Sequence, residues 1–191
     1  SQPGDNQFAV LLLDLDRFRY INDALGHLQG DIFLKILAGR LKKLCRSNYI
    51  LSRSGGDDFV IVIPNATADM AIEFTKNIIE AMQRPLEVAG NHLSASFSIG
   101  IAIFPDNGPD GESMISHAEI AMRQAKKEAR GGYRLVSMTD SRAAEDRVVL
   151  GSALRESLSR GMLQLHYQPQ IEARTGEIYG VEALARWNHP T

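Results

Sequence analysis

The sequence is poor in several features that would mark other classes of protein. It has a single cysteine, Cys45, no long uninterrupted apolar run, and an almost balanced charge of 21 basic against 23 acidic residues. One cysteine excludes an internal disulfide and suits a reducing compartment, so we expect Cys45 in the core. Without a long apolar run, nothing in these residues is predicted to cross a membrane. The net charge of −2 gives no general attraction to nucleic acid or anionic lipid.

These absences favour a cytoplasmic location, and they leave open whether a segment upstream of Ser1 anchors the parent protein in a membrane. Aromatic residues make up 7% of the sequence, and no aromatic pair falls on adjacent central strands. This argues against an RNA-binding plait and against nucleic acid as a partner. The chain of 191 residues is 44% hydrophobic, which is enough to build one proper core.

What the sequence does have is acid at the tip of a predicted hairpin. Two apolar runs, residues 49–53 and 59–63, meet at Gly55-Gly56, which supplies the positive φ of a tight turn. Asp57 and Asp58 follow directly. A second apolar strand, residues 8–14, ends at Asp14, with Asp16 two residues on. If the two strands are neighbours, their carboxylates form a site for a hard cation, which usually also binds substrate phosphates.

The periodicity predicts an α+β fold. Apolar residues recur at helical spacing over residues 30–44, with Asp31 at the N-cap, and again over 68–84 and 111–129. Further strands are predicted over 96–104 and 134–137, with a minor hairpin over 86–95 that turns at Gly90-Asn91. Residues 59–63 lack alternation, which predicts a strand buried on both faces. The order β-α-β-β-α-β is that of a ferredoxin-like plait, the core shared by nucleotidyl cyclases and polymerase palms.

Residues 8–137 resemble the GGDEF domains, which condense two GTP molecules into cyclic di-GMP. The resemblance is carried by the hairpin Arg53 to Pro64, by the stretch Asp14 to Asp31, and by the late segment Glu119 to Lys126 with Arg130. It implies a diguanylate cyclase that works as a homodimer, because each copy supplies one nucleotide. GTP is then the substrate and cyclic di-GMP the product.

The resemblance also implies a role for particular residues. Asp14, the carbonyl of Leu15 and Asp57 would hold Mg²⁺ or Mn²⁺, and Asp57 or Asp58 would favour deprotonation of the attacking hydroxyl. The remaining implied roles concern GTP: backbone amides of the turn Arg17-Phe18-Arg19 with Lys126 and Arg130 for phosphate, and Asn22 and Asp31 for guanine.

Simpler interpretations compete with these roles. Asp14 and Asp16 could be a solvated strand end, and Asp57-Asp58 a plain turn, since Asp is common in turns. For Asp16, which matches no liganding position, the simpler interpretation is preferred. Lys126 and Arg130 could be solvated helix charges, Asn22 a turn residue and Asp31 a simple N-cap.

Several residues depart from the family pattern. Asp58 stands where the family has Glu, and Arg19 stands where it has Lys. Arg123 and Ala129 replace an expected Tyr and Gly. The product-inhibition motif Arg-x-x-Asp reads Arg46 to Tyr49 here, without the Asp. An alternative function is therefore a catalytically weak GTP-binding module that regulates a downstream domain.

That downstream domain is indicated by the last residues. Leu165 to Ile171 and Val181 to Pro190 resemble the opening of an EAL phosphodiesterase, with Glu182 at its first metal-ligand position. Such a barrel needs about 250 residues, so we expect a fragment of a tandem GGDEF-EAL protein. The predicted organisation is a GGDEF domain over 1–138 without the family's opening turn and helix, a linking helix over 139–160, and an EAL start over 161–191.

Overall fold

The computed structural model describes residues 7–137, 153, 156–158 and 160–187. The chain divides into two compact units, residues 1–144 and 145–191. The linking helix expected over 139–160 falls largely outside the described residues and stays a prediction. None of the described helices is both long enough and apolar enough to cross a membrane.

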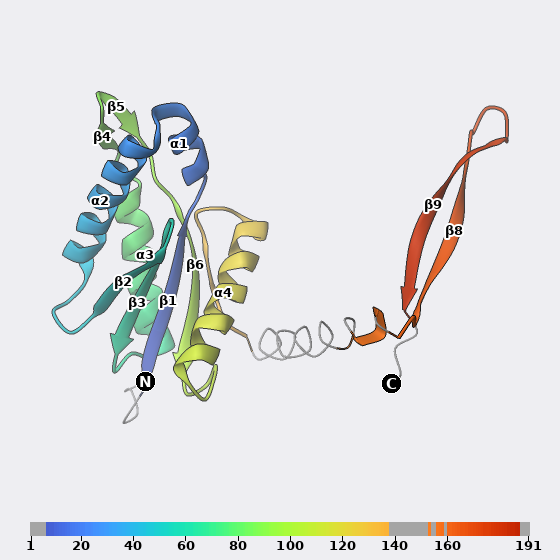
Figure 1. Cartoon of the computed structure of the whole chain (residues 1–191). Coiled ribbons are helices and arrows are strands. Elements are labelled where there is room, and N and C mark those ends of the chain that lie inside the picture. Colours follow the sequence, from blue (N-terminus) through green and yellow to red (C-terminus); the bar gives the residue numbers. More distant parts are fainter. Residues whose placement is uncertain (1–6, 138–152, 154–155, 159, 188–191) are drawn as a thin grey trace. The chain divides into compact units, whose positions relative to one another are not determined.

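The first unit is built around a five-stranded sheet with β1, Phe8–Leu15, at its centre (Figure 1). β1 pairs antiparallel with β3, Asp58–Pro64, on one side and with β6, Phe97–Phe104, on the other. The edges are β2, Ile50–Gly55, beside β3, and β7, Tyr133–Leu135, which runs parallel to β6. The order β2-β3-β1-β6 is that of a ferredoxin-like plait, so the predicted fold class is confirmed.

Helices cover both faces of this sheet. α2, His27–Leu44, and α3, Ala68–Met82, pack on one face, and α4, Gly111–Glu128, packs on the other (Figure 1). β1 therefore sends side chains into two cores, which is why its run is apolar without alternation. On β6, a Cβ added to Gly100 would come within 1.8 Å of the carbonyl oxygen of Ala118. Glycine at this position lets α4 approach the sheet closely.

The prediction that residues 59–63 form a strand buried on both faces is wrong. Phe59, Ile61 and Ile63 of β3 are buried, whereas Val60 and Val62 are only half-buried. α4 packs mainly over β6 and β1, so the second face of β3 stays partly open. Apolar residues occupy both faces of this strand because the second face, with Val60 and Val62, is partly covered, and not because it packs into a second full core.

The start of the first predicted helix, residues 30–44, also differs from the prediction. A separate helix, α1, spans Phe18–Leu25, and α2 begins at His27. Asp31 consequently lies in the second turn of α2, and its assignment as an N-cap is wrong. The polar residues of α1 favour a turn locally, but Phe18 and Ile21 pack against the main core and stabilise a helix there.

The minor hairpin turns one residue earlier than predicted. β4, Leu86–Val88, and β5, Asn91–Leu93, are joined by Ala89 and Gly90, whose φ angles are 51° and 76°. Two consecutive positive φ values are typical of the turn that joins tightly paired strands. The sequence marked the Gly-Asn pair, but the turn uses Ala89 in place of Asn91.

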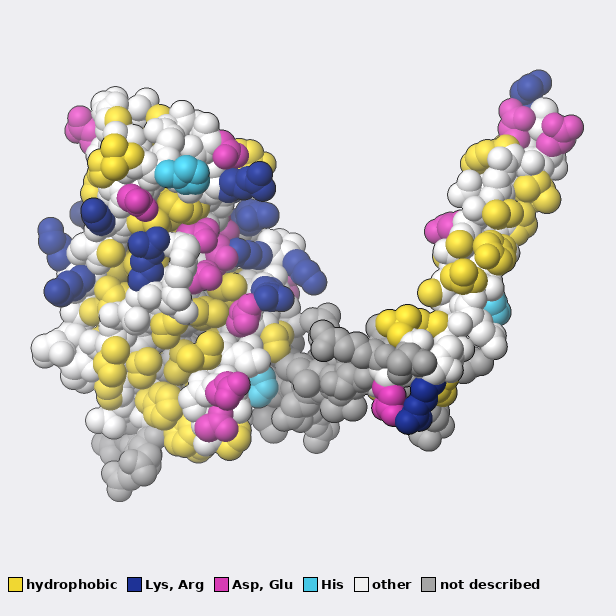
Figure 2. Space-filling model, viewed as in Figure 1, with side chains coloured by type: hydrophobic (Ala, Val, Ile, Leu, Met, Phe, Trp, Pro, Cys, Tyr) yellow, Lys and Arg dark blue, Asp and Glu magenta, His cyan; other side chains and the backbone are white. Residues whose placement is uncertain are grey.

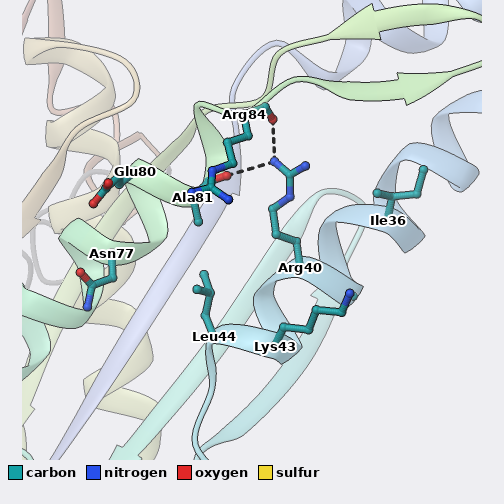
Figure 3. Close-up of a pocket in the computed structure, with 9 residues that line it drawn as sticks. Ile36, Arg40, Lys43, Leu44, Asn77, Glu80, Ala81 and Arg84 are labelled. Carbon is teal, nitrogen blue, oxygen red and sulfur yellow. Dashed lines mark hydrogen bonds between the residues drawn. The ribbon is translucent and has the colours of Figure 1, made fainter.

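A groove of about 730 Å³ lies between α2 and α3 (Figure 3). Arg40 of α2 donates hydrogen bonds across it to the carbonyl oxygens of Ala81, at 3.0 Å, and Arg84, at 2.6 Å. Lys43 and Glu80 also line the groove. The residues that line it include none of the predicted site residues, so the groove is separate from the acidic strand ends.

The second unit contains an antiparallel hairpin of β8, Leu163–Ile171, and β9, Ile178–Trp187. Leu165, Tyr167 and Ile171 stand at alternating positions of β8, and each is more than half exposed. Alternation of this kind gives the hairpin one apolar face.

Candidate active site

The two acidic segments meet at one end of the sheet. β1 and β3 are neighbours, and their register places Asp14 directly opposite Asp58. The amide of Leu15 also donates to the carbonyl oxygen of Asp57, at 3.3 Å. In Figure 2, acidic side chains gather beside basic ones at the end of the sheet where β1 ends and β3 begins. The juxtaposition expected from the sequence is therefore confirmed, while the role of each carboxylate stays a prediction.

The hairpin that carries Asp57 and Asp58 turns at the two predicted glycines. Gly55 and Gly56 have φ angles of 150° and 50°, which long side chains rarely adopt. Arg53 closes the turn by donating from Nε to the carbonyl oxygen of Gly56, at 2.8 Å. The turn is thus closed by the side chain of Arg53 and not by the carboxylates of the hairpin.

Crowding of negative charge perturbs this end of the sheet. Burial, followed by the charges of Asp14 and Asp57, raises the pKa of Asp58 to about 6. Burial also raises the pKa of Asp14, although Lys126 opposes the shift. The Nζ of Lys126, on α4, forms an ion pair with Asp14 Oδ2. The negative charges of Asp14 and Asp57 thus disfavour the charged form of the Asp58 carboxyl.

The donor set at this point fits a divalent cation that shares its coordination with a ligand. Asp58 Oδ1 is buried and has no hydrogen-bond partner among the described residues. Within the same part of the chain, no three carboxylate, His or Cys side chains converge closely enough to hold a metal by themselves. Mg²⁺ is commonly bound by one or two carboxylates together with substrate phosphates. The residues present match that arrangement better than a closed protein cage.

Asp16 differs from Asp14 and from the expectation of a solvated strand end. Its side chain is 2% exposed. It accepts hydrogen bonds from Ser98 Oγ at 2.7 Å, Ser96 Oγ at 2.8 Å and the amide of Gly131 at 2.9 Å. Arg130 Nη1 lies 3.8 Å away. Asp16 therefore joins β1, β6 and the segment after α4, and the simpler interpretation favoured for it is wrong.

The predicted phosphate-binding residues lie around this network. The expected turn at Phe18 and Arg19 is the first turn of α1, which has no side-chain N-cap and no acidic residue. Its first amides therefore have no side-chain partner, as an anion site requires. Arg19 Nε lies 3.7 Å from Asp23, with both side chains largely exposed. Lys126 and Arg130 bring positive charge from the end of α4.

The predicted guanine-binding residues come from two adjacent helices. Asn22 of α1 lies against Gly30 of α2, where a Cβ would come within 1.9 Å of Asn22 Oδ1. Asn22 Oδ1 is buried and has no hydrogen-bond partner within the described residues. Asp31 follows Gly30 and is exposed. An unpartnered amide oxygen on α1 and an exposed carboxylate on α2, next to the glycine that contacts the amide, can read a polar base edge.

Two further positions named from the sequence are the product-inhibition segment and the first metal-ligand position of the EAL domain. Tyr49, in the place of the inhibitory Asp, packs edge-on against Phe74 with ring centroids 5.1 Å apart. Glu182 lies on β9 opposite Gln168 and is exposed. Its role as an EAL metal ligand stays a prediction.

The sequence predicted neither the partners of Asp16 nor the left-handed backbone of Arg17, of which only the amide had been assigned to phosphate. Ser96 and Ser98 carry no motif, and their role depends on strand pairing that a single sequence does not reveal. Arg17 precedes α1 with φ 60°. The one signal in the sequence is its position between a strand that ends in acid and a helix start.

Comparison with known proteins assigns both parts of the chain to known families. The sequence model of the diguanylate cyclase GGDEF domain matches residues 2–132, and that of the EAL domain matches residues 152–191. The GGDEF domain of TpbB (YfiN) from Pseudomonas aeruginosa superposes on the chain with a TM-score of 0.68 at 38% identity. That match covers 70% of this chain and 84% of the other.

Longer relatives match nearly the whole chain. The chain is 37% identical over 186 residues to MucR of Pseudomonas aeruginosa, a bifunctional diguanylate cyclase/cyclic di-GMP phosphodiesterase, covering 97% of this chain and 27% of MucR. It is 33% identical over 183 residues to the cyclic di-GMP phosphodiesterase NbdA of the same organism, covering 96% of this chain and 23% of NbdA. The chain thus spans about a quarter of the length of these curated relatives. It belongs to the GGDEF family of diguanylate cyclase domains and continues into the start of an EAL domain.

Proposed function

We propose that residues 1–138 form a diguanylate cyclase domain that condenses two GTP molecules into cyclic di-GMP. The observation that carries the proposal is the meeting of Asp14, Asp57 and Asp58 at one sheet end beside Lys126 of α4. Carboxylates that can bind a metal ion lie here beside an ammonium group that can bind a triphosphate, and this combination suits nucleotidyl transfer. We further propose that residues 139–160 link this domain to an EAL domain that begins near residue 161.

The cation we propose is Mg²⁺ or Mn²⁺, held by Asp14, the carbonyl of Leu15 and Asp57. When bound, such a cation stabilises the negative charge of the triphosphate. Lys126 is paired with Asp14, and the same ammonium group is close enough to the acidic end to bind a phosphate oxygen instead. Arg130, the amides at the start of α1 and Arg19 supply further donors.

The hydroxyl that attacks the α-phosphate requires a nearby proton acceptor. Asp57 and Asp58 are the carboxylates on the hairpin, and either can accept that proton or orient the hydroxyl. Since one domain binds one GTP, we propose that two copies meet face to face for each turnover. Asn22 and Asp31 then select guanine in each copy.

GTP should bind more tightly than ATP by about one to two decades of affinity. Asp31 can accept two hydrogen bonds from guanine, whereas the adenine edge leaves this acceptor and the amide of Asn22 mismatched. An unsatisfied polar group costs about 1–3 kcal/mol. Calorimetric titrations with both nucleotides and Mg²⁺ measure the difference. Equal affinities, unchanged in Asn22→Ala and Asp31→Ala variants, would remove both residues from base recognition.

One alternative is favoured by a specific residue. Asp58 is one methylene shorter than the Glu that the family has, so its carboxylate is displaced by about 1 Å, and such a displacement can cost about 10²-fold in rate. The domain would then bind GTP with little turnover and regulate the EAL domain. The relative NbdA, a cyclic di-GMP phosphodiesterase, is consistent with this arrangement.

Product analysis separates the two functions, because both predict GTP binding. The tandem protein that contains this chain is incubated with labelled GTP and Mg²⁺, and the products are separated by chromatography. An Asp58→Glu variant restores the family residue and provides the matched comparison. Cyclic di-GMP from the unmodified protein supports the cyclase. Binding without product, with product appearing in Asp58→Glu, supports the regulatory module.

Product inhibition at the Arg46 to Tyr49 segment should be absent or weak. Tyr49 packs against Phe74, so Arg46 lacks a carboxylate partner at the fourth position that could hold a guanine edge. Any cyclase activity should continue as cyclic di-GMP accumulates, and progress curves followed by pyrophosphate release test this. Curves that flatten early in the unmodified protein and straighten in Arg46→Ala would show that the site works without the Asp.

A further inference from the structure

The end of β1 and the segment after α4 enclose a space lined by arginines. Arg17, Arg19, Tyr20 and Arg130 line a cavity of about 570 Å³. A second cavity, of about 440 Å³, shares Arg17, Tyr20 and Arg130 with the first and extends toward Ser96 and the carboxylate of Asp16. Among the described residues, no acidic side chain lines the first cavity. Three guanidinium groups therefore border one space.

The nearby carboxylates leave much of this positive charge without a close partner. Asp16 lies 3.8 Å from Arg130, but it already accepts from two hydroxyls and an amide. Arg19 and Asp23 are 3.7 Å apart and largely exposed, and exposed pairs of this kind interact weakly. Arg17 makes no ion pair with any described residue. The cavity thus has the charge of an anion site.

Arg17 occupies its position against a backbone preference. Its φ and ψ of 60° and 23° lie in the left-handed region, where Gly and Asn are favoured and long side chains are uncommon. Either of those residues would make the turn from β1 into α1 with less strain. A residue held in a disfavoured conformation beside a binding site points to a use for its side chain.

We propose that the guanidinium of Arg17 joins those of Arg19 and Arg130 to bind the terminal phosphates of the nucleotide, and the pyrophosphate that the reaction releases. The inference rests on the proposed function and adds Arg17 to its phosphate-binding residues. Guanidinium groups bind phosphate oxygens through paired, charge-assisted hydrogen bonds. Three of them around one cavity match a pyrophosphate group better than a single α-phosphate, which lies closer to the base.

The test uses inorganic pyrophosphate as the probe and the full chain without divalent cations, so that only protein groups contribute. Calorimetry compares pyrophosphate, GTP and GMP for the unmodified chain and for Arg17→Asn, which suits the left-handed backbone. Arg84→Asn makes the same change at the basic groove between α2 and α3 and serves as the control. A chemical-denaturation curve for each variant verifies that the fold is kept.

We expect Arg17→Asn to weaken pyrophosphate and GTP binding about tenfold, the loss of one charge-assisted contact, while GMP affinity and the Arg84→Asn control stay within twofold of the parent. Pyrophosphate affinity unchanged in Arg17→Asn would overturn the inference, and so would an unmodified chain that binds no pyrophosphate. Pyrophosphate binding through Arg17 in a protein that makes no cyclic di-GMP would remove the proposed catalysis but keep the anion site.

Discussion

Replacing Asp57 by alanine is expected to lower the rate of cyclic di-GMP formation by about 10³-fold, and Asp14→Ala should have an effect of the same size. Each change removes a carboxylate from the proposed cation site, where electrostatic stabilisation of the triphosphate is concentrated. Mg²⁺-dependent GTP binding should weaken in parallel. Turnover and calorimetric affinity are measured for both variants in the tandem protein.

Asp106→Ala is the matched control for these two variants. Asp106 is exposed and follows β6, whose last residue, Phe104, pairs with Phe8 at the opposite end of β1 from Asp14. The control removes the same charge from the opposite end of the sheet, so the variant should keep full activity. If Asp14→Ala kept the nucleotide affinity and activity of the parent, the metal assignment would be wrong.

Asp16→Ala is expected to lower the free energy of unfolding by about 3–5 kcal/mol, the usual cost of removing one partner from a buried charge network. Ser96, Ser98 and the amide of Gly131 would lose their acceptor together, and Arg130 would lose its nearest carboxylate. Urea unfolding of the chain measures the change. Loss of activity in this variant would follow from loss of structure and carries no evidence for a metal ligand.

Asp16→Asn separates folding from chemistry at this position. The amide keeps the volume and one acceptor oxygen, so its cost should be smaller than that of alanine. A change in unfolding free energy within about 0.5 kcal/mol for Asp16→Ala, the range of an ordinary surface substitution, would show that the network does not stabilise the fold.

The sequence predicts the acidic end of this sheet well, because its signals are local. Two apolar runs joined by Gly55-Gly56 indicate a hairpin, and a third run ending at Asp14 indicates a strand. Each element therefore carries its carboxylate at a known end. Local patterns could not show that β1 and β3 are neighbouring strands. The resemblance to a known family implied it.

The misses arise where the deciding contacts are distant in sequence. The hydrogen-bond donors to Asp16 lie 80, 82 and 115 residues further along the chain, so no local pattern distinguishes it from a solvated Asp. Helix α1 is stabilised by packing of Phe18 and Ile21 on the core, whereas its polar residues favour a turn. Asp31 was misplaced for the same reason, since the limits of α1 determine where α2 begins.

The resemblance to a known family grouped the turn at Arg17 to Arg19 with Arg130, but it did not show the cavity that their side chains share, because the two segments are far apart in sequence. Their common space depends on how the end of α4 returns to the sheet, which a charge count cannot show. The balanced overall charge of 21 basic and 23 acidic residues hides this local concentration. This concentration of positive charge can be located only from the folded structure.

A crystal structure of this chain with a slowly reacting GTP analogue and Mg²⁺ would locate both the cation and the nucleotide. We expect a metal ion on Asp14 and Asp57, phosphates against Lys126 and the arginine-lined cavity, and guanine between Asn22 and Asp31. A nucleotide seated in the groove between α2 and α3, with no metal at the ends of β1 and β3, would contradict this assignment.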